Sequence, residues 1–151
     1  MIQFRNAIYI GLVASVLALS ACSTKAQMSH STGFTAQLSG ASEVPPTTSA
    51  ATGTLETSLD KDTNILSWTV TYAGLSSPLT AGHFHGPAMP GQNAGVVVPL
   101  GTNLTSSPIK GKATLTAAQI ADLMAGMWYV NLHTQANPNG EIRGQVNATN
   151  P

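Results

Sequence analysis

The chain has little of what many enzymes and nucleic-acid-binding proteins use. Its 151 residues include one cysteine, Cys22, so neither an intrachain disulfide nor a pair of thiolate ligands can form. Only 8% of the residues are charged and the formal net charge is zero, which argues against nucleic acid as a partner. No Ser/His/Asp order with a nucleophile elbow is recognisable, which argues against a hydrolase.

Long apolar runs are also scarce. The one at Ala7–Leu19 suits the hydrophobic region of a signal peptide and is shorter than the ~20 residues of a membrane span. The stretch "LSAC", which ends at Cys22, resembles the lipobox of bacterial lipoproteins. This resemblance implies cleavage before Cys22 and lipidation of that residue, and Ser23 favours the outer membrane, facing the periplasm.

These features predict three parts of the chain. Residues 1–21 are expected to form a lipoprotein signal peptide, and residues 22–33 the lipidated cysteine with a polar linker. His30 lies in that linker and is expected to be solvated. Residues 34–151 are expected to form one domain, which the lipid at Cys22 would hold at the membrane.

The domain sequence is rich in threonine, valine and glycine, which favour strands and turns. Short segments of alternating apolar and polar residues are separated by turn signals, most clearly around Trp68. One helix is predicted at Thr116–Gly126, with Thr116 as N-cap and with Ile120, Leu123 and Met124 on one face. We therefore expect an all-β fold, a Greek-key-like β-sandwich of about seven or eight antiparallel strands with one short helix.

Two of the four histidines lie one residue apart. In "GHFHG", alternation along a strand places His83 and His85 on one face and Phe84 on the other. Phe84 can then enter the core while the two imidazoles stand together. Such a pair offers a metal two ligands from one rigid element, and imidazole suits zinc, copper, iron and nickel.

A third histidine ends the segment "WYVNLHT". Trp128, Val130 and Leu132 form its apolar set, so His133 is expected to point away from the core. If the two strands are close, three imidazoles converge. A histidine-only set favours copper or zinc over calcium or magnesium. We expect copper, as Cu+ or Cu2+, with zinc as the alternative.

The stretches "FTAQLSGASEVPP", "AGHFHGPA" and "WYVNLHT" with "NPNGEIRGQV" resemble the CHRD domain, first named in chordin and widespread in bacteria. The resemblance spans Phe34 to Val146. The family has no general activity that the resemblance would carry over. In chordin these domains belong to a protein that binds growth factors, which is weak guidance for a bacterial lipoprotein.

A more distant likeness concerns copper/zinc superoxide dismutase, a Greek-key β-sandwich. "HFH" is similar to its first copper-ligand element, His133 to a late ligand, and Arg143 to an arginine that guides the anion. The likeness is one of order and spacing. Counterparts of the zinc ligands and of the disulfide cysteines are missing, so the resemblance implies a copper-only, three-histidine site.

Three further residues are expected near the histidines. Glu141 and Arg143 alternate onto one face of the last strand, where they form either a surface ion pair or a clamp and anion contact at the site. Tyr129 shares a face with His133 and is expected to line the pocket.

Three functions compete at this point: a copper-binding envelope lipoprotein with a metal-handling or redox role, a copper enzyme similar to superoxide dismutase, and an interaction module of the cell envelope. In the last of these, the histidines would be structural and would hydrogen-bond glycine-rich loops in place. The protein partner stays open, as does the choice between a monomer and a homodimer.

Overall fold

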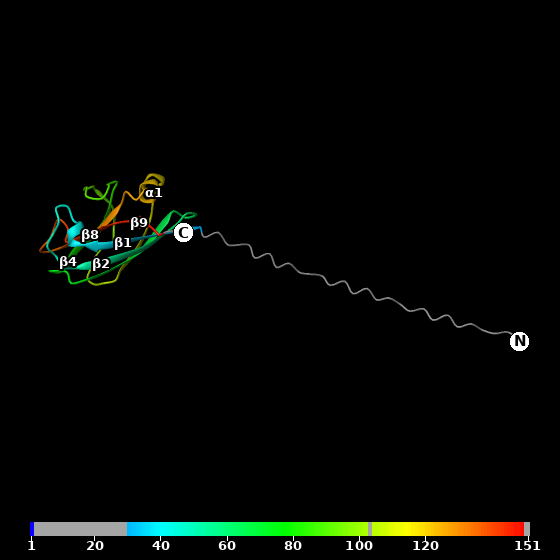
Figure 1. The fold of residues 1–151 in the computed structure, drawn as a ribbon, viewed down its shortest axis with the longest axis horizontal. Coiled ribbons are helices and arrows are strands. Elements are labelled where there is room, and N and C mark those ends of the chain that lie inside the picture. The colour runs from blue at the N-terminus through cyan, green and yellow to red at the C-terminus, as the bar shows by residue number, and fades with distance from the viewer. Residues whose placement is uncertain (2–29, 103, 150–151) are drawn as a thin grey trace.

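The computed structural model describes residue 1 and residues 30–102 and 104–149 (Figure 1). The predicted signal peptide and the lipidation residue Cys22 therefore lie outside the described residues, apart from Met1. Within the described ranges, none of the helices has the length and apolar character needed to cross a membrane.

The domain is built from nine antiparallel strands, a 3-10 turn and one α-helix. The elements are β1 (Ser31–Ser39), η1 (Gly40–Ser42), β2 (Thr52–Asp60), β3 (Ile65–Ala73), β4 (Leu79–His85), β5 (Val96–Pro99), β6 (Ile109–Thr114), α1 (Ala117–Met124), β7 (Tyr129–Thr134), β8 (Ile142–Gln145) and β9 (Asn147–Ala148). This confirms the predicted all-β class with one short helix.

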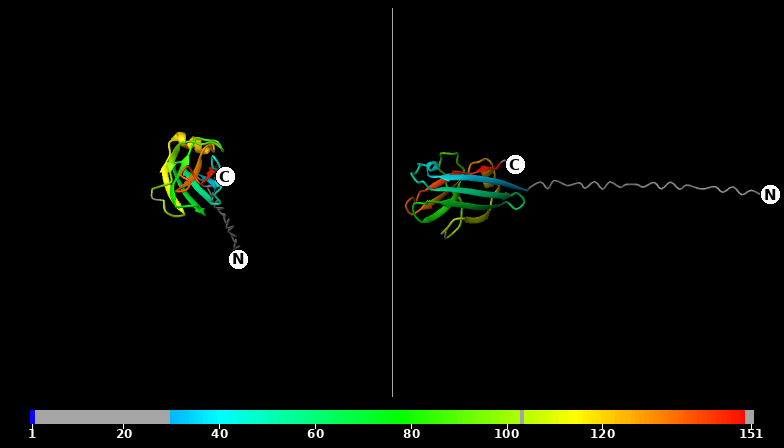
Figure 2. Two further views of the ribbon diagram at one scale, coloured as in Figure 1. Left: turned by 90° about the vertical axis from the view of Figure 1, so that its left-hand side faces the viewer. Right: turned by 60° about the horizontal axis from the view of Figure 1, so that its bottom comes forward.

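The strands form one sheet in the order β5-β4-β7-β8-β1-β2-β3-β6, and the short β9 also pairs with β1. The sheet curves until its two halves face each other (Figures 1 and 2). Trp68 of β3 meets Phe84 of β4 edge to face, with ring centroids 5.3 Å apart, although four strands lie between β4 and β3 in the sheet. The interior between the two halves is the hydrophobic core.

The predicted alternation sets this core. Leu66, Trp68 and Val70 of β3 are buried, and their partners across the β2–β3 hairpin, which include Leu55 and Leu59, are buried as well. On the other half of the sheet, Phe84, Trp128, Val130 and Leu132 are fully buried, as the period of two predicts. Burial of these side chains is the main favourable term in folding the domain.

The helix begins where the sequence predicts. The Thr116 side chain accepts a hydrogen bond from the Gln119 backbone N–H, and the Gln119 side chain accepts one from the Thr116 N–H, which completes a capping box. Leu123 is buried in the core and Ile120 packs against it. Met124 differs from the prediction, because it is 47% exposed and does not share the buried face.

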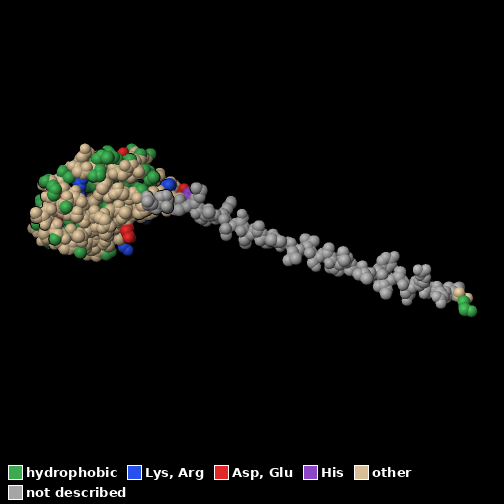
Figure 3. All heavy atoms as spheres, in the orientation of Figure 1, with side chains coloured by type: hydrophobic (Ala, Val, Ile, Leu, Met, Phe, Trp, Pro, Cys, Tyr) green, Lys and Arg blue, Asp and Glu red, His purple; other side chains and the backbone are tan. Residues whose placement is uncertain are grey.

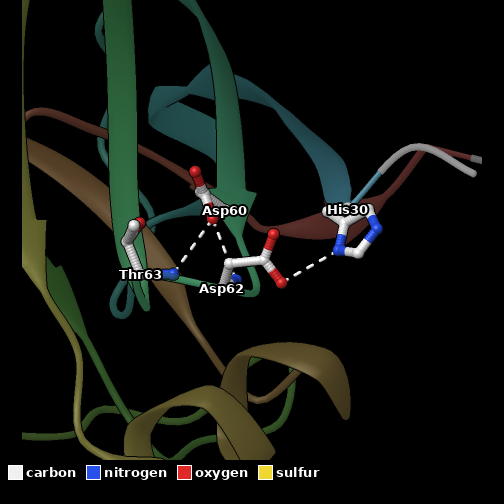
Figure 4. Close-up of polar contacts among 4 residues, drawn as sticks. All are labelled: His30, Asp60, Asp62 and Thr63. Carbon is white, nitrogen blue, oxygen red and sulfur yellow. Dashed lines mark hydrogen bonds and ion pairs between the residues drawn. The ribbon is translucent and has the colours of Figure 1, made fainter. Parts of the chain in front are cut away.

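The first strand begins earlier than expected. Ser31–Gly33, which the sequence places in the linker, already pair with β2. His30, just before them, is exposed, and its Nδ1 lies 2.9 Å from Oδ1 of Asp62 in the β2–β3 turn (Figure 4). Asp60 caps the same turn by accepting hydrogen bonds from the backbone N–H groups of Asp62 and Thr63 (Figure 4).

Charged side chains are sparse on the face shown in Figure 3. The composition predicts this, since only 8% of the residues are charged. Loops that include Gln92 and Pro138 cover the outer face of β7 and β8. Strand β7 is consequently buried on both faces except at His133.

Candidate metal centre

The register of three neighbouring strands brings the candidate residues together. His83 of β4 lies opposite Asn131 of β7, and Asn131 lies opposite Arg143 of β8. In the next rows, His85 is paired with Tyr129, and His133 with Ala81. All these side chains stand on the outer face of the sheet, because Phe84 and the alternate residues of β7 point into the core.

Three histidines converge on this face, as the sequence analysis expected. The ligand nitrogens of His83, His85 and His133 all lie within 4.8 Å of one another. The closest pair is His83 Nδ1 and His133 Nε2, at 3.2 Å. His85 is buried, whereas the other two rings are half-buried, so the cluster is sheltered but reachable from solvent.

A hydrogen bond to a backbone carbonyl determines which nitrogen of the His133 ring carries the proton. Its Nδ1 lies 2.9 Å from the Pro138 carbonyl oxygen, which can only accept a hydrogen bond. Nδ1 is therefore the donor, and the neutral ring keeps its lone pair on Nε2, the atom that faces His83. Fixing the outer nitrogen of an imidazole in this way is the arrangement found around metal-binding histidines.

Both ring nitrogens of His85 have a hydrogen-bond partner. Its Nδ1 lies 3.0 Å from the Ala94 carbonyl oxygen, which can only accept a hydrogen bond. Its Nε2 lies 3.0 Å from Oδ1 of Asn131, which is also an acceptor, so a neutral His85 ring can donate to only one of these two oxygens. Asn131 is 3% exposed, and alternation along β7 already placed it on the same face as His133.

The neutral forms of His83 and His133 are favoured. Burial lowers the pKa of His83, and the charges that His133 and His85 would carry lower it further. Burial also lowers the pKa of His133, against the opposing effect of its hydrogen bond to Pro138. Neutral imidazoles are the form that binds metals, so the site is prepared for a cation at neutral pH.

The spacing of one pair of nitrogens fits a transition metal. Metal–nitrogen bonds of about 2.0–2.1 Å at a tetrahedral angle separate two ligand nitrogens by roughly 3.3 Å, close to the 3.2 Å between His83 and His133. The cluster contains neither a carboxylate nor a thiolate among the described residues. Three imidazoles would hold the ion and leave a coordination position open.

Tyr129 and Arg143 lie beside the histidines, as expected, in a stacked arrangement. The Tyr129 ring is parallel to the His85 ring at 4.8 Å, and Cζ of Arg143 lies 3.9 Å from the Tyr129 centroid. Arg143 is 2% exposed and donates to the Gln92 carbonyl oxygen and to Asn93 Oδ1. Its guanidinium thus holds the loop that contains Gln92 and Asn93 in place over the sheet.

Glu141 is fully buried and does not pair with Arg143 in the structure. Its carboxylate accepts hydrogen bonds from Ser49, Ser76, Thr134 and Asn137. Burial raises the pKa of this group, but the hydrogen bonds outweigh burial and hold the pKa at about 2. Glu141 therefore anchors the turn whose Pro138 carbonyl orients His133, without touching the histidines itself.

One residue near the histidines is not among those expected there. Glu43 follows η1, far from the histidines in the chain, and it is 5% exposed. It lines a hollow of about 400 Å³ together with His85 and His133. Glu43 comes close to these histidines because the β1–β2 loop packs against the β7–β8 turn at Gly140.

One of three comparisons with known proteins finds a match. The family model of the CHRD domain matches residues 34–146, which is most of the chain and includes all three histidines of the cluster. No curated protein and no solved structure matches the chain.

Proposed function

The chain belongs to the CHRD domain family, and on that premise we propose that its domain binds a transition metal ion, copper in the first place, through His83, His85 and His133. The observation that carries the proposal is the convergence of three imidazole nitrogens within 4.8 Å. The His133 ring has its Nδ1 bound to the Pro138 carbonyl oxygen, so that its Nε2 lone pair is available.

Copper is favoured by the chemistry of the donors. Calcium and magnesium prefer oxygen ligands, whereas neutral imidazole suits copper and zinc. At a shared nitrogen site, copper(II) binds more tightly than zinc in the usual order of affinities. Zinc fits the same three histidines and serves as the competing ion in any test.

The role we propose is metal handling or redox chemistry in the bacterial cell envelope. Three protein ligands leave room for a further ligand, through which a metal can be exchanged or react. A lipid on Cys22 would hold the domain at the membrane, which we propose is the outer membrane facing the periplasm.

A structural role for the histidines has its own support. His85 ties the loop at Ala94 to β4, and His133 ties the loop at Pro138 to β7. These hydrogen bonds would stabilise the two loops even without a metal. In that case the domain would act as an interaction module, and substitution of the histidines would lower stability without any effect on metal affinity.

Electron paramagnetic resonance of the copper(II)-loaded chain distinguishes the two roles. Coordination by imidazole predicts nitrogen hyperfine structure that is lost in the His83→Ala/His85→Ala variant. His30→Ala is the matched control, because His30 lies outside the cluster and pairs with Asp62 instead. A spectrum of unbound copper in the unsubstituted chain would contradict the proposal.

A further inference from the structure

Asn131 lies in the middle of the histidine cluster. It is the cross-strand partner of His83, and it shares a face of β7 with His133, two residues further on. Its side chain reaches the third histidine, because Oδ1 lies 3.0 Å from Nε2 of His85. The residue is 3% exposed and lines the hollow of about 400 Å³ together with His85 and His133. One buried amide therefore neighbours all three proposed ligands.

The contact between Asn131 and His85 leaves one polar contact without a proton. Nδ1 of His85 faces the Ala94 carbonyl oxygen and Nε2 faces Oδ1 of Asn131, and both oxygens are acceptors. A neutral imidazole has a single N–H. When that N–H donates to Ala94, Nε2 and Oδ1 direct their lone pairs at each other. A cation bound to both atoms removes this repulsion and gives each buried atom a partner.

The spacing of these two atoms suits copper(II). A metal ion at about 2.0–2.1 Å from both would bind them at an angle of roughly 90–95°, because they are 3.0 Å apart. A right angle separates neighbouring ligands in the tetragonal nitrogen-and-oxygen sites of copper(II). Zinc prefers the wider tetrahedral angle. The pair thus favours copper(II) over zinc on geometric grounds.

We propose that Asn131 is a fourth ligand of the metal through Oδ1, and that it completes a set of three nitrogens and one oxygen selective for copper(II). This proposal rests on the proposed metal site. The amide oxygen takes the coordination position that the three imidazoles leave open. Copper binds carbonyl oxygen less well than imidazole, so an incoming ligand can displace the amide while the histidines hold the ion.

Electron–nuclear double resonance of the full-length, copper(II)-loaded chain in deuterated water tests this. The unsubstituted chain should lack the strong deuteron couplings of a water bound in the plane of the copper ligands, because Asn131 fills that position. Asn131→Ala should gain these couplings, since water replaces the lost oxygen, and its preference for copper(II) over zinc should fall about tenfold. Asn131→Asp keeps an oxygen donor and should lack the couplings again.

Asn139→Ala is the matched control, because Asn139 is an exposed asparagine that lines the same hollow. It should reproduce the unsubstituted spectrum. Strong water couplings in the unsubstituted chain, with nitrogen hyperfine structure present, would overturn the proposal and leave the metal site intact. Asn131 would then only hydrogen-bond His85, through its NH2 group. Absence of copper binding by the unsubstituted chain would remove the metal site and this proposal together.

Discussion

His83 Nδ1 and His133 Nε2 lie 3.2 Å apart, although fifty residues separate them in the sequence. The contact exists because β4 and β7 are hydrogen-bonded neighbours, in a register that pairs His83 with Asn131 and His133 with Ala81. Without a metal, one ring donates a hydrogen bond to the other. With a metal, both nitrogens turn their lone pairs to the ion, so metal binding and this hydrogen bond exclude each other.

The first prediction concerns the pH dependence of copper binding. Burial, followed by neighbouring imidazole charges, lowers the pKa of His83 below its ordinary value of 6.5, and burial also lowers the pKa of His133. Because a lowered pKa preserves the neutral base in more acidic solution, His83 and His133 should weaken copper binding by protonation mainly below pH 6.5. Competition with a chelator between about pH 5 and about pH 8 measures this. A fall that is already half complete above pH 6.5 would contradict the prediction.

The second prediction concerns Glu141→Gln. The substitution replaces a carboxylate acceptor by an amide whose NH2 group faces donors such as the Thr134 hydroxyl and the Ser76 N–H. We expect the free energy of unfolding to fall by about 2–4 kcal/mol, as measured by urea denaturation.

Glu56→Gln provides the control for Glu141, because Glu56 is exposed on β2. It should change the free energy of unfolding by less than about 0.5 kcal/mol. The low pKa of Glu141, about 2, adds a pH signature. The stability that ionised Glu141 supplies is present above its unfolded value of 4.5 and is lost as the pH falls toward 2. An equal effect of the two variants would contradict the anchoring role.

The third prediction concerns Glu43 and stability. Its pKa rises from 4.5 in the unfolded chain to about 7 in the folded one, so the folded state holds the proton more tightly. Stability is therefore lost as the pH rises from 4.5 to about 7. Relative to the unsubstituted chain, Glu43→Gln should gain about 1–2 kcal/mol between pH ~5 and pH ~8, after allowance for solvent screening. Urea denaturation of both proteins at the two pH values measures the gain, and a difference independent of pH would refute it.

The fourth prediction concerns the packing of β8 on β1. A Cβ at Gly144 would overlap the backbone carbonyl of Gln37, and a backbone atom cannot swing aside as a side chain does. Gly144→Ala should lower the free energy of unfolding by about 2–3 kcal/mol. Gly95→Ala is the matched control, since nothing lies within 4 Å of its added Cβ. Equal unfolding midpoints for the two variants would contradict the close approach.

Much of the fold could be predicted from local pattern. Alternation placed Phe84, Trp128, Val130 and Leu132 in the core, and the Thr116 cap placed the helix. Alternation also put His83 and His85 on one face, because the period of a strand is two whatever its neighbours are. Ser31–Gly33 and Met124 were misplaced, because strand pairing and helix packing decide them rather than local composition.

The contacts around the site could not be predicted in the same way. Glu43 reaches the hollow through a loop whose course depends on the whole sheet, and no spacing in the sequence connects it with His133. Glu141 was expected beside Arg143 on one strand face. It is instead turned toward hydroxyl groups of Ser49 and Ser76, because a buried carboxylate requires donors and these loops supply them.

Copper titration of the full-length chain, purified without a histidine tag, tests the central claim most directly. We expect one copper ion bound per chain. Binding should be retained in His30→Ala and lost in His83→Ala/His85→Ala, because only the double variant removes ligands of the cluster. Cys22 is unchanged in all three proteins and does not affect the comparison. Equal copper affinity in the double variant, or no binding in the unsubstituted chain, would contradict the proposed metal site. The histidines would then serve to hydrogen-bond the loops to the strands.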